Sequence, residues 1–140
     1  MERTNILLGS EFEELIGFSR AVRVGPMVVV GGTAPLDDDG NTVGVGDIAA
    51  QTRRCFEIVQ IALERAGASL DDVVRTRLIM TELDEYRAAA AVRKEFVGHV
   101  KPVDTIMKID SFVNPEWLIE VEVDAVIADS AAGQEAIGGI

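Results

Sequence analysis

The chain has 140 residues, of which 48% are hydrophobic and 26% are charged, as expected for one folded domain. Its formal net charge of −11 repels phosphate backbones, so nucleic acid is not an expected partner. The apolar runs are far shorter than the roughly 20 residues that a membrane helix needs, and a single cysteine cannot form a disulfide within the chain. We therefore expect a cytoplasmic domain that does not contact a membrane.

Hydrophobic periodicity predicts strands and helices in the order β-β-α-β-α-β-β. Segments that alternate with a period of two, or that form a β-branched run, are expected to be strands. Segments with apolar residues at helical spacing are expected to be helices. The strands are expected at residues 20–24, 27–30, 73–80, 104–111 and 117–127, and the helices at about 47–65 and from Thr81 or Asp84 to about 97.

Turn and capping residues support these boundaries. Gly25-Pro26 predicts a tight turn between the first two strands, and residues 35–46 have the composition of a loop. Asp47 is placed to cap the first helix, and Gly67 lies just beyond its end.

This order of elements predicts an α+β fold, a two-layer sandwich in which two helices cover one face of a mixed sheet. The strand at 73–80 is expected beside the first hairpin. The other sheet face would be covered by further subunits. We expect an N-terminal segment at 1–14, the domain at 15–128 and a flexible tail at 129–140.

Several segments, in order and spacing, resemble the RidA (YjgF) family of enamine and imine deaminases. They are Phe18-Ser19-Arg20-Ala21, residues 30–35, residues 47–52, residues 67–74, Phe96, Lys101-Pro102 and Ile119-Glu120-Val121-Glu122. The resemblance covers roughly residues 15–128, and residues 67–74 carry its most specific part. It implies a chorismate-mutase-like fold, a homotrimer around a central barrel, and small-molecule ligands bound in the clefts between subunits.

The resemblance also implies a site. Deaminating members hold a substrate carboxylate with an arginine just after a Pro-x pair, and a glutamate on the last strand positions the hydrolytic water. Glu120 matches that glutamate, but Asp104 stands at the position of the arginine. An aspartate about 4 Å from a substrate carboxylate would repel it by about 4 kcal/mol at an effective dielectric near 20. The sequence therefore resembles a divergent member with altered specificity.

Two further positions are less polar than in the family, because Phe18 replaces a common tyrosine and Ala90 a common asparagine. Ser19 and Arg20 remain candidates for ligand binding, and Arg20 is the better substitute for the missing arginine. A surface arginine is the plainer interpretation of Arg20. A salt bridge from Arg20 or a neighbouring subunit to Asp104 would leave a neutral pocket.

Other candidates have plainer interpretations as well. Gly32 and Thr33 could offer a backbone amide or a hydroxyl to a ligand, although Gly-Gly at a strand end is more often a bend. Glu120 could belong to a solvated strand face shared with Glu122 and Asp124. The sequence predicts no metal site and no cofactor.

Two residues that often carry chemistry are assigned no role. Cys55 lies among apolar positions of the first helix and is expected in the core. His99 is the only histidine, is expected at the surface, and cannot form a tetrahedral zinc site alone.

Three functions stay open. The first is hydrolytic deamination of a neutral or cationic enamine, imine or related small metabolite, with Glu120 orienting water and Asp104 contacting the amine end. The second is a non-catalytic trimer that binds a small ligand. The third is the ribonuclease activity sometimes attached to this family, which the net charge and the lack of a histidine pair disfavour.

Overall fold

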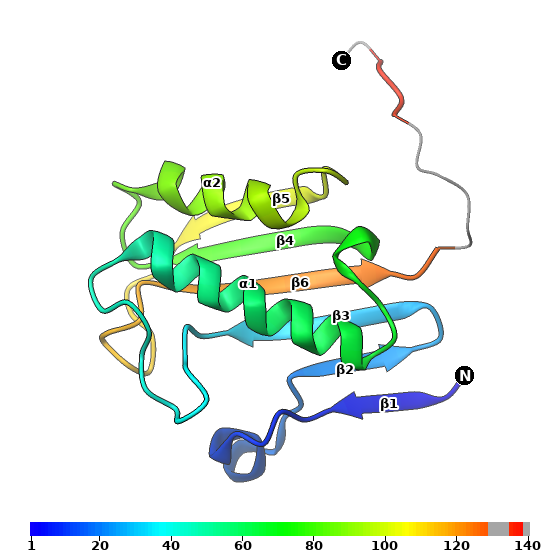
Figure 1. The fold of residues 1–140 in the computed structure, drawn as a ribbon, viewed down its shortest axis with the longest axis horizontal. Coiled ribbons are helices and arrows are strands. Elements are labelled where there is room, and N and C mark those ends of the chain that lie inside the picture. The colour runs from blue at the N-terminus through cyan, green and yellow to red at the C-terminus, as the bar shows by residue number, and fades with distance from the viewer. Residues whose placement is uncertain (129–134, 139–140) are drawn as a thin grey trace.

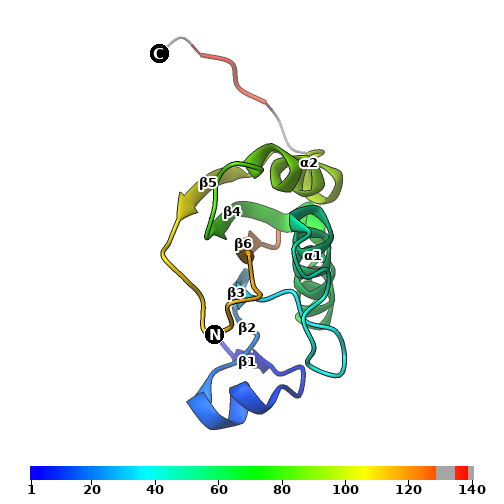
Figure 2. The same ribbon diagram turned by 90° about the vertical axis from the view of Figure 1, so that its left-hand side faces the viewer.

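The computed structural model describes residues 1–128 and 135–138. Within them, one mixed sheet carries two helices on a single face (Figures 1 and 2). The strands are β1 (Arg3–Ile6), β2 (Ala21–Val24), β3 (Met27–Thr33), β4 (Val73–Met80), β5 (Val103–Lys108) and β6 (Ile119–Val126). The helices are α1 (Ile48–Arg65) and α2 (Tyr86–Val97), with a π-helical turn η1 (Glu13–Gly17) and a 3-10 turn η2 (Leu70–Asp72).

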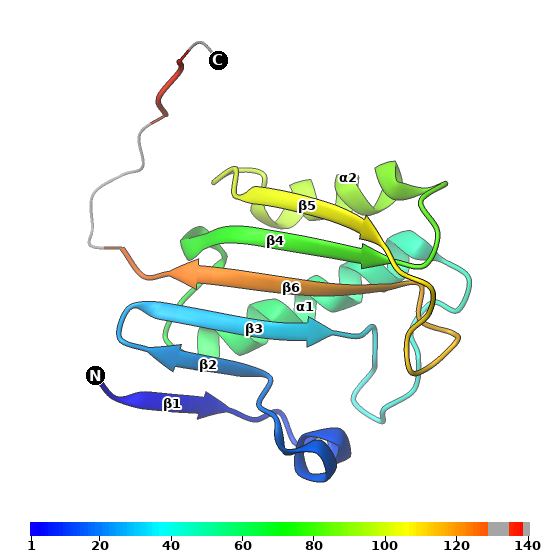
Figure 3. The same cartoon turned by 180° about the vertical axis from the view of Figure 1, so that it is seen from behind.

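The strand order is β1-β2-β3-β6-β4-β5. All pairings are antiparallel except the parallel pair of β4 and β5, which α2 connects. The expectation that β4 lies beside the first hairpin is wrong, because β6 is inserted between β3 and β4 (Figure 3). Each neighbour of β6 gains an antiparallel ladder, which satisfies backbone groups that would otherwise be buried without partners.

Helix α1 forms where capping and periodicity predict it. The side chain of Asp47 accepts a hydrogen bond from the backbone N–H of Ala50 at 3.1 Å. One stripe of the helix is buried against the sheet, including Cys55, Phe56 and Leu63, each with no exposed surface. Burial of an apolar stripe of this kind supplies most of the stability of such a helix.

The N-terminal strand β1 was not predicted. It pairs with β2 in a four-residue antiparallel ladder, and Ile6 is buried in the same core as the helices. The domain therefore includes part of the segment assigned to residues 1–14. The expected tail at 129–140 lies largely outside the described residues.

Helix α2 begins at Tyr86, later than Thr81 or Asp84, because neither side chain caps it. The backbone instead makes turns in which Tyr86 N–H donates to Leu83 at 3.0 Å and Ala88 N–H donates to Glu85 at 3.0 Å. The turn at Gly25-Pro26 is as predicted, with Gly25 at a φ of 58°, where glycine is favoured.

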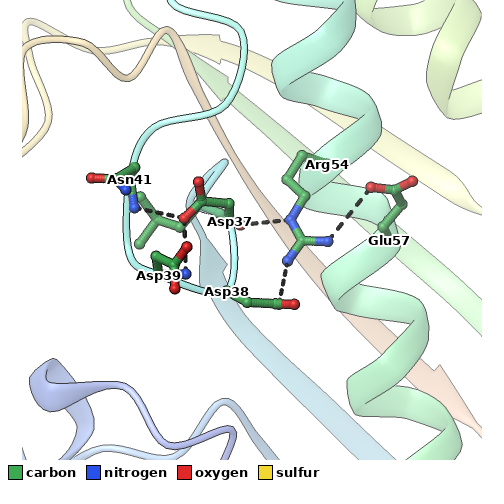
Figure 4. A network of polar contacts seen from close by, with 7 residues as sticks. Asp37, Asp38, Asp39, Asn41, Arg54 and Glu57 are labelled. Carbon is green, nitrogen blue, oxygen red and sulfur yellow. Dashed lines mark hydrogen bonds and ion pairs between the residues drawn. The ribbon is translucent and has the colours of Figure 1, made fainter.

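The loop between β3 and α1 is fastened to α1 through Arg54 (Figure 4). Its guanidinium donates to the carbonyl of Leu36 and lies 3.3 Å from Asp38 and 3.7 Å from Glu57. The carboxylate of Asp37 closes the loop by accepting from the backbone N–H groups of residues 39 and 41, each at 2.9 Å. These contacts hold the loop against α1 directly after β3, the strand that carries Gly31 and Gly32.

Candidate functional site

The face of the sheet away from the helices, which we call the open face, carries the acidic side chains of β6. Glu120, Glu122 and Asp124 alternate with Ile119, Val121 and Val123, which are buried under the helices. Arg77 lies 3.8 Å from Glu122, and Arg75 lies 3.4 Å from Asp124. Two of the three acids are therefore neutralised across the β4–β6 ladder, and neither pair includes Glu120.

Glu120 lies against Gly32 of β3. A Cβ atom added to Gly32 would be 2.8 Å from Oε1 of Glu120, so a larger residue there would push the carboxylate away. The pairing of β3 with β6 shifts register between Val30 and Thr33, as the predicted bend at Gly31-Gly32 requires. The bulge and the missing side chain together make room for this carboxylate.

Burial raises the pKa of Glu120, and the neighbouring charge of Glu122 raises it further. Attraction by Arg20 opposes both effects without cancelling them. A carboxylate whose pKa is shifted toward neutrality is suited to accept or donate a proton under physiological conditions.

Arg20 lies immediately before β2 and reaches the same bulge. Its Nη2 donates to the carbonyl of Gly32, and its guanidinium carbon lies 5.6 Å from the ring centroid of Phe18. Its Nε is buried and has no hydrogen-bond partner among the described residues. Burial lowers the pKa of Arg20, and the charges of Glu13 and Glu120 counteract this.

Ser19 and Thr33 are both engaged within the chain. The Ser19 hydroxyl accepts from the side-chain amide of Asn5 at 2.8 Å. The Thr33 hydroxyl donates to the carbonyl of Gly31 at 2.7 Å, and the residue is fully buried. Of the residues predicted for the site, the structure thus gathers Phe18, Arg20, Gly32 and Glu120.

Asp104 lies elsewhere in the chain. It stands opposite Thr76 of β4 on the face covered by the helices, whereas Glu120 stands opposite Ile79 on the open face. Its Oδ1 accepts from the hydroxyl of Thr76 at 2.7 Å and lies 3.3 Å from Nε of Arg93 on α2. The structure therefore does not place Asp104 and Glu120 on one surface of a single chain, and the cation that pairs with Asp104 is Arg93.

Replacing Asp104 by arginine should destabilise the protein, because two guanidinium groups would then face each other beside Thr76. We expect Asp104→Arg to lower the free energy of unfolding by about 1–3 kcal/mol. Reversing the pair with Arg93→Glu in the same chain should recover part of that loss. Urea denaturation of both single variants and the double variant measures the coupling, and additive effects would contradict the ion pair.

Two charged residues that act on predicted site residues were missed by the sequence interpretation: Arg93, which pairs with Asp104, and Glu13, whose charge acts on Arg20. Arg93 gave no local signal, since its role arises from the packing of α2 on β5. Glu13 is 6% exposed, and its carboxylate accepts three backbone N–H groups, from Leu8, Gly9 and Ser10, at 2.8–3.0 Å. The spacing of Ser10 and Glu13 is that of a capping box, a signal that could have identified Glu13.

The remaining candidates agree with their plainer interpretations. Cys55 is fully buried, and burial raises the pKa of its thiol well above the usual range. His99 is exposed and lies 2.6 Å from Asp71. No cluster of three potential metal-ligating side chains occurs in residues 1–128 and 135–138, and no helix there is long and apolar enough to cross a membrane.

A layer of two helices on a six-stranded sheet of this strand order is the chorismate-mutase-like α+β fold. In this chain the half-buried carboxylate of Glu120 lies on the open face of that sheet. The family model described as Endoribonuclease L-PSP matches residues 9–127. The chain belongs to this family, which is the YjgF/RidA family that the sequence resembles.

Individual relatives agree. The Mycobacterium tuberculosis protein Rv2704, a member of the YjgF/YER057c/UK114 family, is 42% identical with a TM-score of 0.81, covering 90% of this chain and all of its own. A Streptomyces coelicolor protein, SCO2049, is 34% identical over 84% of this chain and 87% of its own length. Escherichia coli TdcF, solved with bound serine, is 21% identical over 89% of this chain and 94% of its own, with a TM-score of 0.73, and supports the fold alone.

Proposed function

We propose that this protein is a hydrolytic deaminase of a small reactive enamine or imine and that Glu120 is its catalytic residue. The observation that carries the proposal is the position of Glu120, half-buried on the open face against a glycine, with a raised pKa and no ion-pair partner within 4 Å among the described residues. The family's structural relatives include a member crystallised with a small amino acid, TdcF with serine.

The chemistry needs one base and one water molecule. The Glu120 carboxylate accepts a proton from water as the water oxygen attacks the imine carbon, and a tetrahedral carbinolamine forms. The proton passes from Glu120 to the nitrogen, which completes the neutral carbinolamine, and Glu120 then carries the proton of the carbinolamine hydroxyl to the same nitrogen. The C–N bond breaks, ammonia leaves and the carbon becomes a carbonyl. Positioned proton transfer of this kind contributes about a hundredfold to ten-thousandfold to a rate.

The substrate is proposed to be neutral or cationic. Asp104 stands where related deaminases carry an arginine, and Arg93 neutralises it, so that position offers no net positive charge to a carboxylate. Because Asp104 lies on the edge strand β5 and Glu120 on the open face, the two would share a cleft only between neighbouring subunits.

The experiment is ammonia release from 2-iminopropionate, generated in situ, and from its neutral carboxamide analogue, each with and without the protein. We expect the protein to accelerate release from the carboxamide more than from the carboxylate. A preference for the carboxylate would contradict the substrate class, and no acceleration of either would contradict the deaminase.

A homotrimer is proposed because the open face is apolar at its margins. Met27, Val29, Val103 and Val126 are 40–61% exposed there, and single copies rarely leave such a face bare. Light scattering should give a mass of three times 15.1 kDa.

A lysine on the open face should break this assembly. Val29→Lys places a charge beside Asp124, which a single copy tolerates and an apolar interface does not, so the mass should fall to that of one chain. Ile61→Lys, on α1, is the control and should leave the mass unchanged. A trimer that persists in Val29→Lys would place the interface elsewhere.

The second candidate is a trimer that binds a small ligand without turning it over. It is favoured by one observation: Asp104, at the position where related deaminases carry a substrate-binding arginine, pairs with Arg93 instead. Calorimetry with the carboxamide analogue, alongside the ammonia assay, separates binding from catalysis. The family model's description as an endoribonuclease suggests a third activity, which the net charge of −11 disfavours.

A further inference from the structure

The guanidinium of Arg20 is turned toward its own chain. Its Nη2 donates to the carbonyl of Gly32, and its guanidinium carbon lies 5.6 Å from the ring centroid of Phe18. Bidentate recognition of a substrate carboxylate needs two parallel N–H groups of the guanidinium free at once. With Nη2 used and Nε buried, Arg20 is poorly arranged to bind a ligand directly.

What Arg20 does hold is the backbone that faces Glu120. The carbonyl that it binds belongs to Gly32, the residue against which Oε1 of Glu120 lies. The backbone of Arg20 also accepts from Gly31 N–H at 3.0 Å and donates to Ile6 at 2.8 Å. Side chain and main chain together fix both glycines of the bulge.

Arg20 is the positive group that acts on the carboxylate of Glu120, and the other charged groups near it are negative or already paired. Glu122, two residues along β6, is negative and is itself paired with Arg77. Ile79 faces Glu120 from β4, and Cys55 lies behind it on α1 with a buried thiol that stays protonated. Glu13 acts on Arg20 from the N-terminal segment, with its carboxylate held by three backbone N–H groups.

We propose that Arg20 is a positioning residue, which holds the Gly31-Gly32 bulge against Glu120 and supplies the positive charge that acts on this carboxylate. The inference rests on the proposed function, since it assigns Arg20 an effect on the catalytic base. It separates two roles that a guanidinium beside a carboxylate could have, namely binding the substrate and setting the state of the base.

Kinetics distinguish the two roles. In Arg20→Gln, the acid limb of the kcat/KM profile should move to higher pH, because the carboxylate loses the attraction of the Arg20 charge, while KM changes little. Arg20→Lys should restore the position of the limb. A KM that rises severalfold with an unmoved limb would overturn the proposal in favour of direct substrate binding.

The matched control is Arg23→Gln. Arg23 also donates from a strand to backbone carbonyls, to Gly25 at 2.9 Å and to Ala66 at 2.7 Å, but on the face that α1 covers. Losing it should lower the thermal midpoint without moving the acid limb. If Arg23→Gln moved the acid limb of the kcat/KM profile as far as Arg20→Gln does, the shift would come from a general loss of stability, and the proposal would fail.

A second readout needs no substrate and so separates this inference from the proposed function. Carbon-13 NMR of the Glu120 carboxyl, assigned with Glu120→Gln, follows its titration directly in the unaltered chain and in Arg20→Gln. The midpoint should rise in Arg20→Gln even if the protein releases no ammonia. An unmoved midpoint would overturn the role of Arg20, whatever the enzyme assay gives.

Discussion

Glu120→Gln should lower ammonia release by about a hundredfold to ten-thousandfold, because the amide keeps the shape of the side chain but cannot accept a proton from water. In the unaltered protein, kcat/KM should fall as the pH drops through the raised pKa of Glu120, since only the ionised form is a base. The acid limb should be absent from any residual activity of the variant. Steady-state kinetics over a range of pH measure both effects.

The same substitution should not weaken the fold. Because burial raises the pKa of Glu120, folding disfavours its charged form, and stability falls as the pH rises through the window between the unfolded and the raised folded pKa. Glu120→Gln removes that charge, so the midpoint temperature of its unfolding at neutral pH should match or exceed that of the unaltered chain.

The activity control for Glu120→Gln is Asp124→Asn, which lies further along the same face and should keep near-normal activity. Normal turnover in Glu120→Gln would end the case for this residue.

Gln51→Leu should lower the free energy of unfolding by about 2–5 kcal/mol. Gln51 is fully buried on α1, where its Nε2 donates to Glu116 at 2.9 Å and its Oε1 accepts from the N–H of Leu118 at 2.8 Å. Leucine has a similar volume but leaves both backbone groups without this partner, and each unsatisfied buried group costs about 1–3 kcal/mol. Urea denaturation measures the loss.

The control for this prediction is on the same helix. Gln60 is half-buried, and among the described residues its side chain bonds only to Glu64, at 3.2 Å, so Gln60→Leu should change stability by less than about 0.5 kcal/mol. Because Gln51 fastens the chain just before β6, its replacement should also reduce activity through Glu120. Equal stabilities for the two variants would mean that water replaces the lost side chain.

The elements that sequence predicted well are those whose signal is local. The cap at Asp47, the apolar stripe of α1 and the turn at Gly25-Pro26 each depend on neighbouring residues, and each is confirmed. Strand β1 has no alternating pattern of its own, because only Ile6 of its four residues is buried. Its existence depends on the edge of β2, which a local pattern does not reveal.

The candidate site was predictable to the same degree. The period of two placed Glu120, Glu122 and Asp124 on one face, and the Gly-Gly bend predicted the bulge beside them. The partner of Asp104 was not predictable, because Arg93 reaches it from α2 through the packing of a helix on a strand. The sequence likewise could not show which of these three acids has no arginine opposite it, because that depends on the register of β4 against β6.

The central position of β6 has a consequence for biosynthesis. Strands β3 and β4 lie on either side of β6, which is synthesised after every other strand in residues 1–128 and 135–138, so this sheet remains split into two parts until residue 126 has left the ribosome. Until then, both parts expose unpaired edges next to apolar surfaces, a state prone to association with other chains. Nascent chains of this protein should therefore depend on chaperones until the final strand emerges, and C-terminal truncations into β6 should be insoluble.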